Sequence, residues 1–139
     1  MSETAASVEL TDFTNLRRHN SPNTWLVAPA GFGALAADEA APSVPVDAAV
    51  LARAWVAVVQ AQPRTSLLAV SADGLQVEAE QRSSVFGFID RVSFRAIPLA
   101  EQRSTLVAYS RSEVDYWDLG VNRSRLRSWI AALGQAITE

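Results

Sequence analysis

The chain has 139 residues, a formal net charge of −3 and no cysteine, and all 12 of its basic residues are arginine. This composition excludes a disulfide, a cysteine-ligated metal, a lysine Schiff base and a P-loop lysine. The single histidine, His19, also excludes a multi-histidine metal site within one chain. With 49% hydrophobic and 19% charged residues, the sequence is typical of one soluble globular domain.

No stretch of the chain approaches the roughly 18 consecutive apolar residues that a transmembrane helix requires. The first residues also lack the basic and apolar regions of a secretory signal. We therefore expect a cytoplasmic protein without a transmembrane segment, which reaches a membrane only peripherally, through a partner.

The first 46 residues contain four prolines and two glycines, which favour irregular structure. We predict that residues 1–46 form an extended N-terminal arm and that residues 47–139 form the folded domain. Within the arm, the apolar run from Trp25 to Val27 suits either an edge strand or an extended segment. Phe13 and Leu16 are expected to lie against the same core.

Apolar pairs at helical spacing predict a first helix over about 47–62, with Asp47 as its N-cap and Pro63 as its stop. The period then changes to that of strands. Two runs, 66–70 and 75–80, flank Asp73 and Gly74, which is a hairpin signal.

A third strand is predicted over about 91–97, with Val92, Phe94 and Ala96 directed inward and Pro98 at its end. A fourth strand follows over about 104–112. The last helix is predicted over about 122–137, with an apolar stripe along one side. Asn122 is its expected N-cap.

This order predicts an α+β fold, in which an antiparallel four-stranded sheet carries two helices packed on one face, plus the extended N-terminal arm. The other face of the sheet is expected to meet solvent or a partner. Its outward side chains are Gln76, Glu78, Arg91 and Arg95.

The charges are unevenly distributed along the chain. Residues 1–81 hold four arginines against nine acids, whereas residues 82–127 hold eight arginines against five acids. The later part is therefore where an anionic partner is expected, with ordinary solvated strand faces as the alternative. An acidic total without lysine disfavours nucleic-acid binding.

Two segments differ from generic strands and loops. The first is Phe86-Gly87-Phe88-Ile89-Asp90, followed by Val92 and Phe94, and the second runs from Ser110 and Ser112 to Asp118-Leu119-Gly120-Val121-Asn122-Arg123 and Arg125. Together with Ser21-Pro22-Asn23 and Gln62-Pro63-Arg64-Thr65, they resemble the bacterial domain of unknown function family 1499 from about residue 20 to residue 133. The resemblance implies a family fold but supplies no activity, substrate or cofactor.

Arg123 and Arg125 fall in the first turn of the last predicted helix, where the helix dipole disfavours cations. Two interpretations account for this. Either Asp90 or Asp118 pairs with an arginine, or an anion binds at the helix N-terminus. The candidate polar cluster for both is Arg82, Asp90, Arg111, Asp118, Asn122, Arg123 and Arg125.

The sequence offers no catalytic set, and we predict no catalytic residue, metal or cofactor. His19 lies in the arm, far in sequence from the serines at 83, 84, 110 and 112. An enzyme that uses carboxylates or a Ser–His19 pair is the least favoured alternative.

Large aromatic residues beside arginines are typical of interface anchors, and the candidates are Tyr116, Trp117 and Trp25. We therefore expect a non-catalytic interaction domain, such as an accessory subunit or an assembly factor of a larger complex. The alternative function is binding of a small anionic molecule by the arginine and aspartate cluster.

Overall fold

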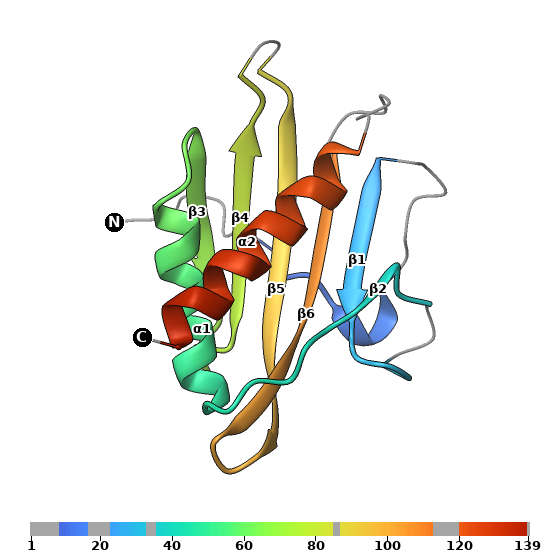
Figure 1. Cartoon of the computed structure of the whole chain (residues 1–139). Helices are drawn as coiled ribbons and strands as arrows, with labels where there is room; N and C mark the ends of the chain where they lie inside the picture. Colours follow the sequence, from blue (N-terminus) through green and yellow to red (C-terminus); the bar gives the residue numbers. More distant parts are fainter. Residues whose placement is uncertain (1–8, 17–22, 33–35, 85–86, 113–119, 139) are drawn as a thin grey trace.

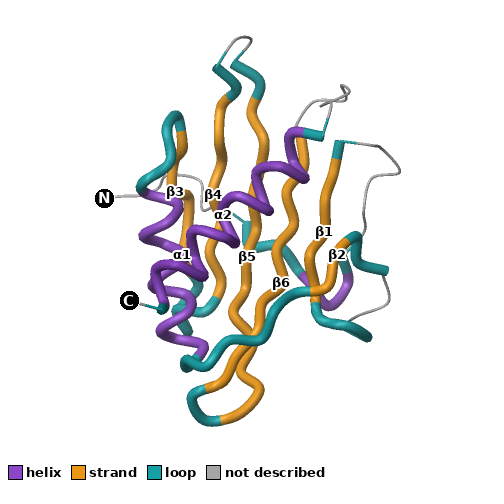
Figure 2. Tube along the Cα trace, viewed as in Figure 1, coloured by secondary structure: helices purple, strands orange, loops and turns teal. Residues whose placement is uncertain are grey.

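The computed structural model describes residues 9–16, 23–32, 36–84, 87–112 and 120–138. Its elements, in chain order, are the short 3-10 helix η1 (Phe13–Asn15), β1 (Thr24–Ala28), β2 (Glu39–Ala40), α1 (Ala48–Gln60), β3 (Thr65–Val70), β4 (Gln76–Arg82), β5 (Ile89–Ala100), β6 (Arg103–Ser112) and α2 (Val121–Ile137). Figure 2 shows these elements along the trace, with the helices in purple and the strands in orange.

The sheet has six strands in the order β2-β1-β6-β5-β4-β3. The pairing is antiparallel except between β1 and β2, which are parallel. The predicted α+β class is confirmed, but the predicted four-stranded antiparallel sheet is wrong. The Trp25 run forms β1, which pairs with β6 and leaves β2 at the sheet edge. This pairing hydrogen-bonds one side of β6 that a four-stranded sheet would have left open.

Both helices cover one face of the sheet (Figure 1). The core between the layers includes Trp55 of α1, which is fully buried and stacks on Phe94 at 4.5 Å between ring centroids. Val92 and Ala96 lie on the same face of β5 as Phe94, as the alternating pattern predicts.

The beginnings of the two helices differ from the sequence predictions. Asp47 occupies the N-cap position of α1, but its carboxylate accepts a hydrogen bond from the Gln102 amide at 2.7 Å instead of capping the helix. At α2 the N-cap is Gly120, whose φ of 83° suits glycine. The prediction that Asn122 caps this helix is therefore wrong, because its side chain is buried inside the first turn.

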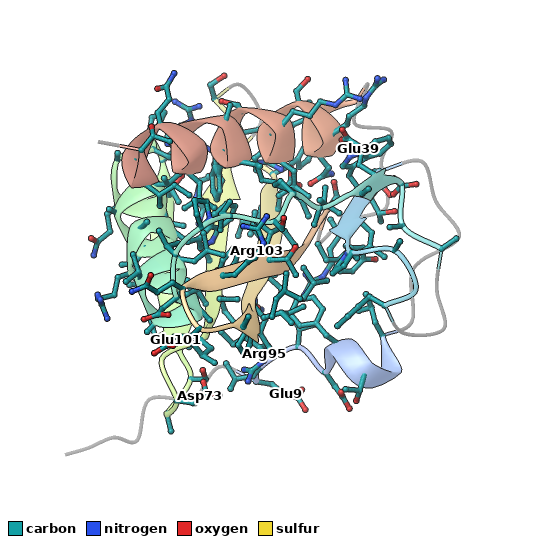
Figure 3. The ribbon with its side chains drawn as sticks, turned by 60° about the horizontal axis from the view of Figure 1, so that its bottom comes forward. Glu9, Glu39, Asp73, Arg95, Glu101 and Arg103 are labelled. Carbon is teal, nitrogen blue, oxygen red and sulfur yellow. The ribbon has the colours of Figure 1, made fainter. Side chains whose placement is uncertain are left out.

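The β3–β4 hairpin forms around Asp73 and Gly74, as predicted. Hydrogen bonds from Ser71, from Arg95 and from the Leu75 amide hold the pKa of Asp73 well below its usual range. Figure 3 shows Asp73 and Arg95 next to one another, joined by an ion pair of 2.7 Å.

The predicted end of the third strand at Pro98 is wrong. β5 continues to Ala100, and an irregularity in its pairing with β6 lies between these two residues. A proline is accommodated there because a bulge relieves the need for its missing amide.

The face of the sheet opposite the helices is covered by the N-terminal segment, which we define as residues 9–16. Figure 1 shows this segment passing behind the strands, on the side away from α2. Gln76 and Glu78 are consequently only 5% and 0% exposed. The expectation that they face solvent or a partner is wrong, since a segment of the same chain buries them.

Candidate functional site

A buried polar network lies beneath the first turns of α2, and it brings three of the predicted site residues together. The Arg125 guanidinium donates to the Asp90 carboxylate at 2.8 Å and to the Asn122 side-chain oxygen at 2.8 Å. All three residues are at most 8% exposed. Because the Asp90–Arg125 ion pair is removed from water, each charge depends on the other for compensation.

Two further side chains complete this network. Arg125 donates from Nε to the Gln81 side-chain oxygen at 2.6 Å and from a terminal nitrogen to Ser110 at 3.1 Å. Ser110 donates in turn to the Asn122 oxygen at 2.5 Å. The Asn122 amide nitrogen donates to the main-chain oxygen of Asn23 at 2.9 Å, which ties the entry of β1 to α2.

Regular structure explains why distant segments meet here. Asn122 and Arg125 are three residues apart on α2 and so share one helix face. Asp90 is paired with Ser112 across β5 and β6, which places this end of β5 beside the end of β6. Gln81 belongs to the same face of β4 as the buried Val77 and Ala79, because side chains alternate along a strand.

The contacts of Arg125 correspond to the ion-pair interpretation of the helix N-terminus. Each of its three guanidinium nitrogens donates to a protein acceptor. Its positive charge near the N-terminus of α2 is offset by Asp90. Arg125 therefore has a protein acceptor for each of its guanidinium nitrogens.

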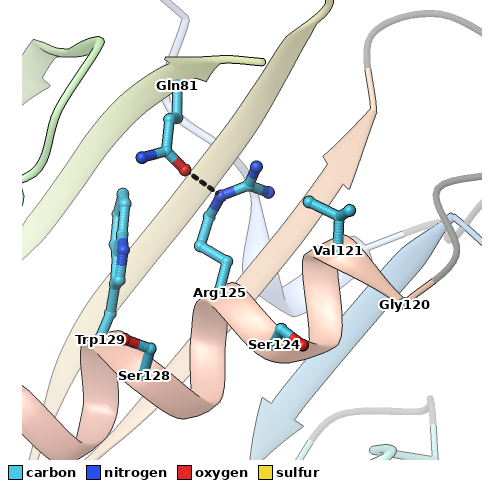
Figure 4. A pocket seen from close by; sticks show the side chains of 7 residues that line it. All are labelled: Gln81, Gly120, Val121, Ser124, Arg125, Ser128 and Trp129. Atoms are coloured by element: carbon cyan, nitrogen blue, oxygen red, sulfur yellow. Dashed lines mark hydrogen bonds between the residues drawn. The ribbon is translucent and has the colours of Figure 1, made fainter. Parts of the chain in front are cut away.

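A cleft of about 320 Å³ opens beside the network, at the N-terminal end of α2. Figure 4 shows Arg125 and Gln81 hydrogen-bonded at its wall. Its lining residues are Gln81, Gly120, Val121, Ser124, Arg125, Ser128 and Trp129.

The other predicted cluster residues lie elsewhere. Arg82 is exposed and donates to the Gly87 carbonyl at 3.3 Å. Arg111 projects from the opposite face of the sheet, where it donates to Ser93 at 2.9 Å and lies over the Tyr109 ring. Arg123 is exposed on the outer side of α2. The remaining candidates, Asp118, Tyr116 and Trp117, lie outside the described residues.

A second candidate site lies on the side of α2 that faces β1 and β2. The Arg123 guanidinium lies over the ring of Trp25 at 5.3 Å from the centroid. The Trp25 indole donates to Glu39 at 2.8 Å, and Arg127 donates to the same carboxylate oxygen at 3.0 Å. The Trp25 ring thus links Arg123 to Glu39, and Arg127 binds the same acid directly.

Glu39 retains its negative charge in this cluster. Its partial burial acts to raise the pKa of its carboxyl, but the hydrogen bonds from Arg127 and Trp25 and the charges of Arg127 and Arg123 outweigh that effect. The net result is a pKa below the usual range. Two guanidinium groups therefore surround one carboxylate, which leaves the cluster with a positive excess.

A groove of about 490 Å³ adjoins the cluster, and we call it the α2–β2 groove. It lies between α2 and the edge of the sheet formed by β1 and β2. It is lined by Val27, Glu39, Ala40, Pro42, Arg127, Ile130 and Ala131. Five of these are apolar, so the groove combines an apolar wall with a charged rim.

Sequence reasoning missed two residues of these sites. Gln81 lies on the same strand face as the buried residues Val77 and Ala79. A polar residue at a position that the alternation marks as buried indicates a buried hydrogen bond, so the sequence did contain a signal for Gln81. Glu39 carried no comparable signal, because its role depends on β2 joining the sheet edge beside α2.

In the described ranges, no group of three or more His, Cys, Asp or Glu side chains is arranged to hold a metal ion. Among the helices described, none is long and apolar enough to cross a membrane. A family model described as "Protein of unknown function (DUF1499)" matches residues 17–133. No curated protein and no solved structure matches the chain.

Proposed function

The chain belongs to the DUF1499 family, and because that family is described as proteins of unknown function, we propose a role from the geometry of this member. The protein is a non-catalytic interaction domain that binds an acidic and apolar segment of a partner protein in the α2–β2 groove. In this role it serves as an accessory subunit or assembly factor of a larger complex. We place it in the cytoplasm, where it reaches a membrane only through its partner.

The observation that carries this proposal is the combination of a largely apolar groove with Arg127 in its lining and a second exposed arginine, Arg123, one helical turn away on α2. Ile130 and Ala131 supply apolar surface, and Arg127 is 50% exposed in its side chain. Exposed apolar surface that is rimmed by polar groups is typical of interaction sites. The excess of guanidinium groups selects a partner segment that carries carboxylates.

Trp25 is held in place before a partner arrives. Its indole nitrogen is engaged by Glu39 and its ring face by Arg123, so the side chain has little freedom to lose on binding. Pre-organised aromatic and arginine side chains are the groups most enriched at binding hot spots. The predicted interface residue Trp25 therefore supports the docking surface, together with Arg123.

A panel of short labelled peptides tests the proposal. The first alternates leucine and glutamate, the second leucine and arginine, and the third serine and glutamate. We expect the leucine–glutamate peptide to bind at least about tenfold more tightly than the other two, which corresponds to about 1.4 kcal/mol. Fluorescence anisotropy measures each dissociation constant.

The matched variants remove exposed cations in different places. Replacing both Arg123 and Arg127 by alanine should weaken binding of the leucine–glutamate peptide by about tenfold or more. Arg53→Ala on the exposed side of α1 should leave it unchanged. Equal binding of all three peptides, or equal loss in the Arg53 variant, would rule out the α2–β2 groove as the binding surface.

Binding of a small anionic molecule in the cleft beside Arg125 is the second candidate function. The cleft lies at a helix N-terminus, which favours anions. Against it, the guanidinium nitrogens of Arg125 are already engaged by protein acceptors. Stabilisation of the wild type by inorganic phosphate or citrate in a thermal-shift assay supports this second function, and an unchanged melting temperature removes it.

A further inference from the structure

The face of the sheet opposite the α2–β2 groove contains two adjacent sockets that hold the N-terminal segment. The polar socket is formed by Gln76, Glu78, Ser93 and Arg111, and it receives Thr11. The apolar socket is formed by Leu26, Ala28, Val107 and Tyr109, and it receives Phe13. Thr11 and Phe13 are two residues apart, so this face of the sheet binds one short segment of the chain through both sockets. Figure 3 shows this segment on the side of the sheet away from α2.

The polar socket is partly organised by the sheet itself. The Glu78 carboxylate is fully buried and accepts hydrogen bonds from Ser93 at 2.5 Å and from the Gln76 amide at 3.1 Å. Arg91 lies 3.3 Å from the same carboxylate. A charged carboxylate at the centre of a sheet face is costly to bury unless the covering chain also supplies donors.

The N-terminal segment supplies those donors through one residue. The Thr11 amide donates to Glu78 at 2.9 Å, and the Thr11 carbonyl accepts from Gln76 at 2.7 Å. The Thr11 hydroxyl lies 2.7 Å from the Ser93 hydroxyl and within 3.4 Å of Arg111. Main-chain donor, main-chain acceptor and side chain are all recognised, which is how a protein binds a peptide.

The apolar socket holds Phe13 at only 6% exposure. Between the two sockets the match is incomplete. The Tyr109 hydroxyl and Arg91 Nε are buried, and neither has a hydrogen-bond partner among the described residues. Buried polar groups normally have hydrogen-bond partners. The N-terminal segment therefore leaves two hydrogen-bonding groups of this face unused, and another ligand could bind them.

We propose that this face is a second recognition site, for a peptide of a partner protein, and that the N-terminal segment occupies it as an intramolecular pseudo-ligand. The partner peptide presents a serine or threonine and, two positions later, an aromatic residue. It also carries an acceptor oxygen that pairs with the Tyr109 hydroxyl, and it thereby displaces the N-terminal segment. This proposal is independent of the function assigned to the α2–β2 groove, because the two sites lie on opposite faces.

A labelled peptide that matches residues 7–16 tests the site with the full-length protein. The Thr11→Ala/Phe13→Ala double variant keeps the chain length and vacates both sockets. If the segment occupies the site for at least about nine-tenths of the time, the double variant binds the peptide about tenfold or more tightly than the wild type. Leu10→Ala, on an exposed side chain of the same segment, should bind like the wild type.

A peptide with alanine at the positions of Thr11 and Phe13 should not bind the double variant. A folded double variant that binds the matching peptide no more tightly than the wild type would overturn the proposal, as would equal binding of the two peptides. If the double variant does not fold, hydrogen exchange of the wild type decides. Excess matching peptide should lower the protection of residues 9–16, and unchanged protection contradicts the proposal.

The acceptor requirement and the identity of the occupant are tested separately. In a series of matching peptides with glutamate placed at each position in turn, at least one should bind the double variant more tightly. That gain in affinity should disappear when Tyr109→Phe is added to the double variant. A gain that persists, or no gain at all, overturns the assignment of the acceptor.

Sedimentation should show that the protein is a monomer. A dimer that exchanges its N-terminal segments would mean that a second copy occupies the site, and it would overturn the proposal of a partner peptide.

Discussion

An Asp90→Ala variant is expected to lose about 3–5 kcal/mol of unfolding free energy, which lowers the melting temperature by roughly 10–20 °C. The substitution leaves the Arg125 guanidinium buried without its counter-charge, while Gln81, Ser110 and Asn122 still hold it in place. Urea denaturation monitored by tryptophan fluorescence measures the loss.

A double-mutant cycle shows whether the loss comes from the ion pair. Arg125→Leu alone should also be strongly destabilising, but Asp90→Ala combined with Arg125→Leu should cost clearly less than the sum of the two, by about 1–3 kcal/mol. Arg127→Ala, which removes an exposed pair with Glu39, is the control and should cost at most about 1 kcal/mol. Strict additivity in the cycle would mean that Asp90 and Arg125 are not coupled.

A Trp55→Ala variant is expected to cost about 3–5 kcal/mol, because it opens a cavity between α1 and the sheet. The Trp55 ring is fully buried, lies at 10° to the plane of Phe94, and contacts Trp129 at 5.8 Å between centroids. Thermal and urea denaturation give the magnitude.

Trp55→Phe is the informative companion, because the indole nitrogen of Trp55 has no hydrogen-bond partner in the part of the chain that the structure describes. Phenylalanine keeps a ring against Phe94 and removes that unsatisfied donor, so this variant should cost less than about 2 kcal/mol. If the two variants were equally destabilised, ring stacking could not be what anchors α1 to the sheet.

Local patterns predicted most of the regular elements. The alternation of Val92, Phe94 and Ala96 placed β5 correctly on the core, and the spacing within residues 47–62 predicted α1. Both patterns report burial over short stretches of chain, which periodicity captures directly. The family resemblance that was predicted from short sequence motifs is also confirmed by the matching family model.

The features that were missed depend on contacts between distant parts of the chain. The short run at Trp25 suited either an edge strand or an extended segment, because nothing local shows that Leu26 pairs with Tyr109 across more than eighty residues. Gln76 and Glu78 had the phase of solvent-facing strand residues, and only the docking of Thr11 buries them. The polarity of these residues alone could not distinguish a sheet face exposed to solvent from one covered by another segment of the chain.

The candidate site was predicted in part for a related reason. The Arg125 charge in a helix first turn signalled a need for compensation, and Asp90 supplies it. Asn122 was assigned to the cap by residue type, whereas Gly120 begins the helix and frees Asn122 to bind Ser110 and Asn23. Asn122 therefore joins the buried polar network with Asp90 and Arg125, but the predicted capping role is wrong.

The two proposed recognition surfaces lie on opposite faces of one sheet. The α2–β2 groove is lined in part by Arg127, with Arg123 one helical turn away on α2, whereas the sockets for Thr11 and Phe13 are already filled. The Asp90–Arg125 network lies between α2 and the sheet and fixes the helix that presents the groove.

Site-specific photo-crosslinking most directly tests the claim that this is an interaction domain acting through the α2–β2 groove. A photoreactive amino acid is placed in the full-length protein at Ala131, which lines the groove, or at Arg53 on the exposed side of α1. We predict a defined adduct from position 131 to a partner segment that contains acidic and apolar residues, and its loss when Arg123 and Arg127 are replaced by alanine. An adduct that survives this replacement, or that forms equally from position 53, would contradict the account.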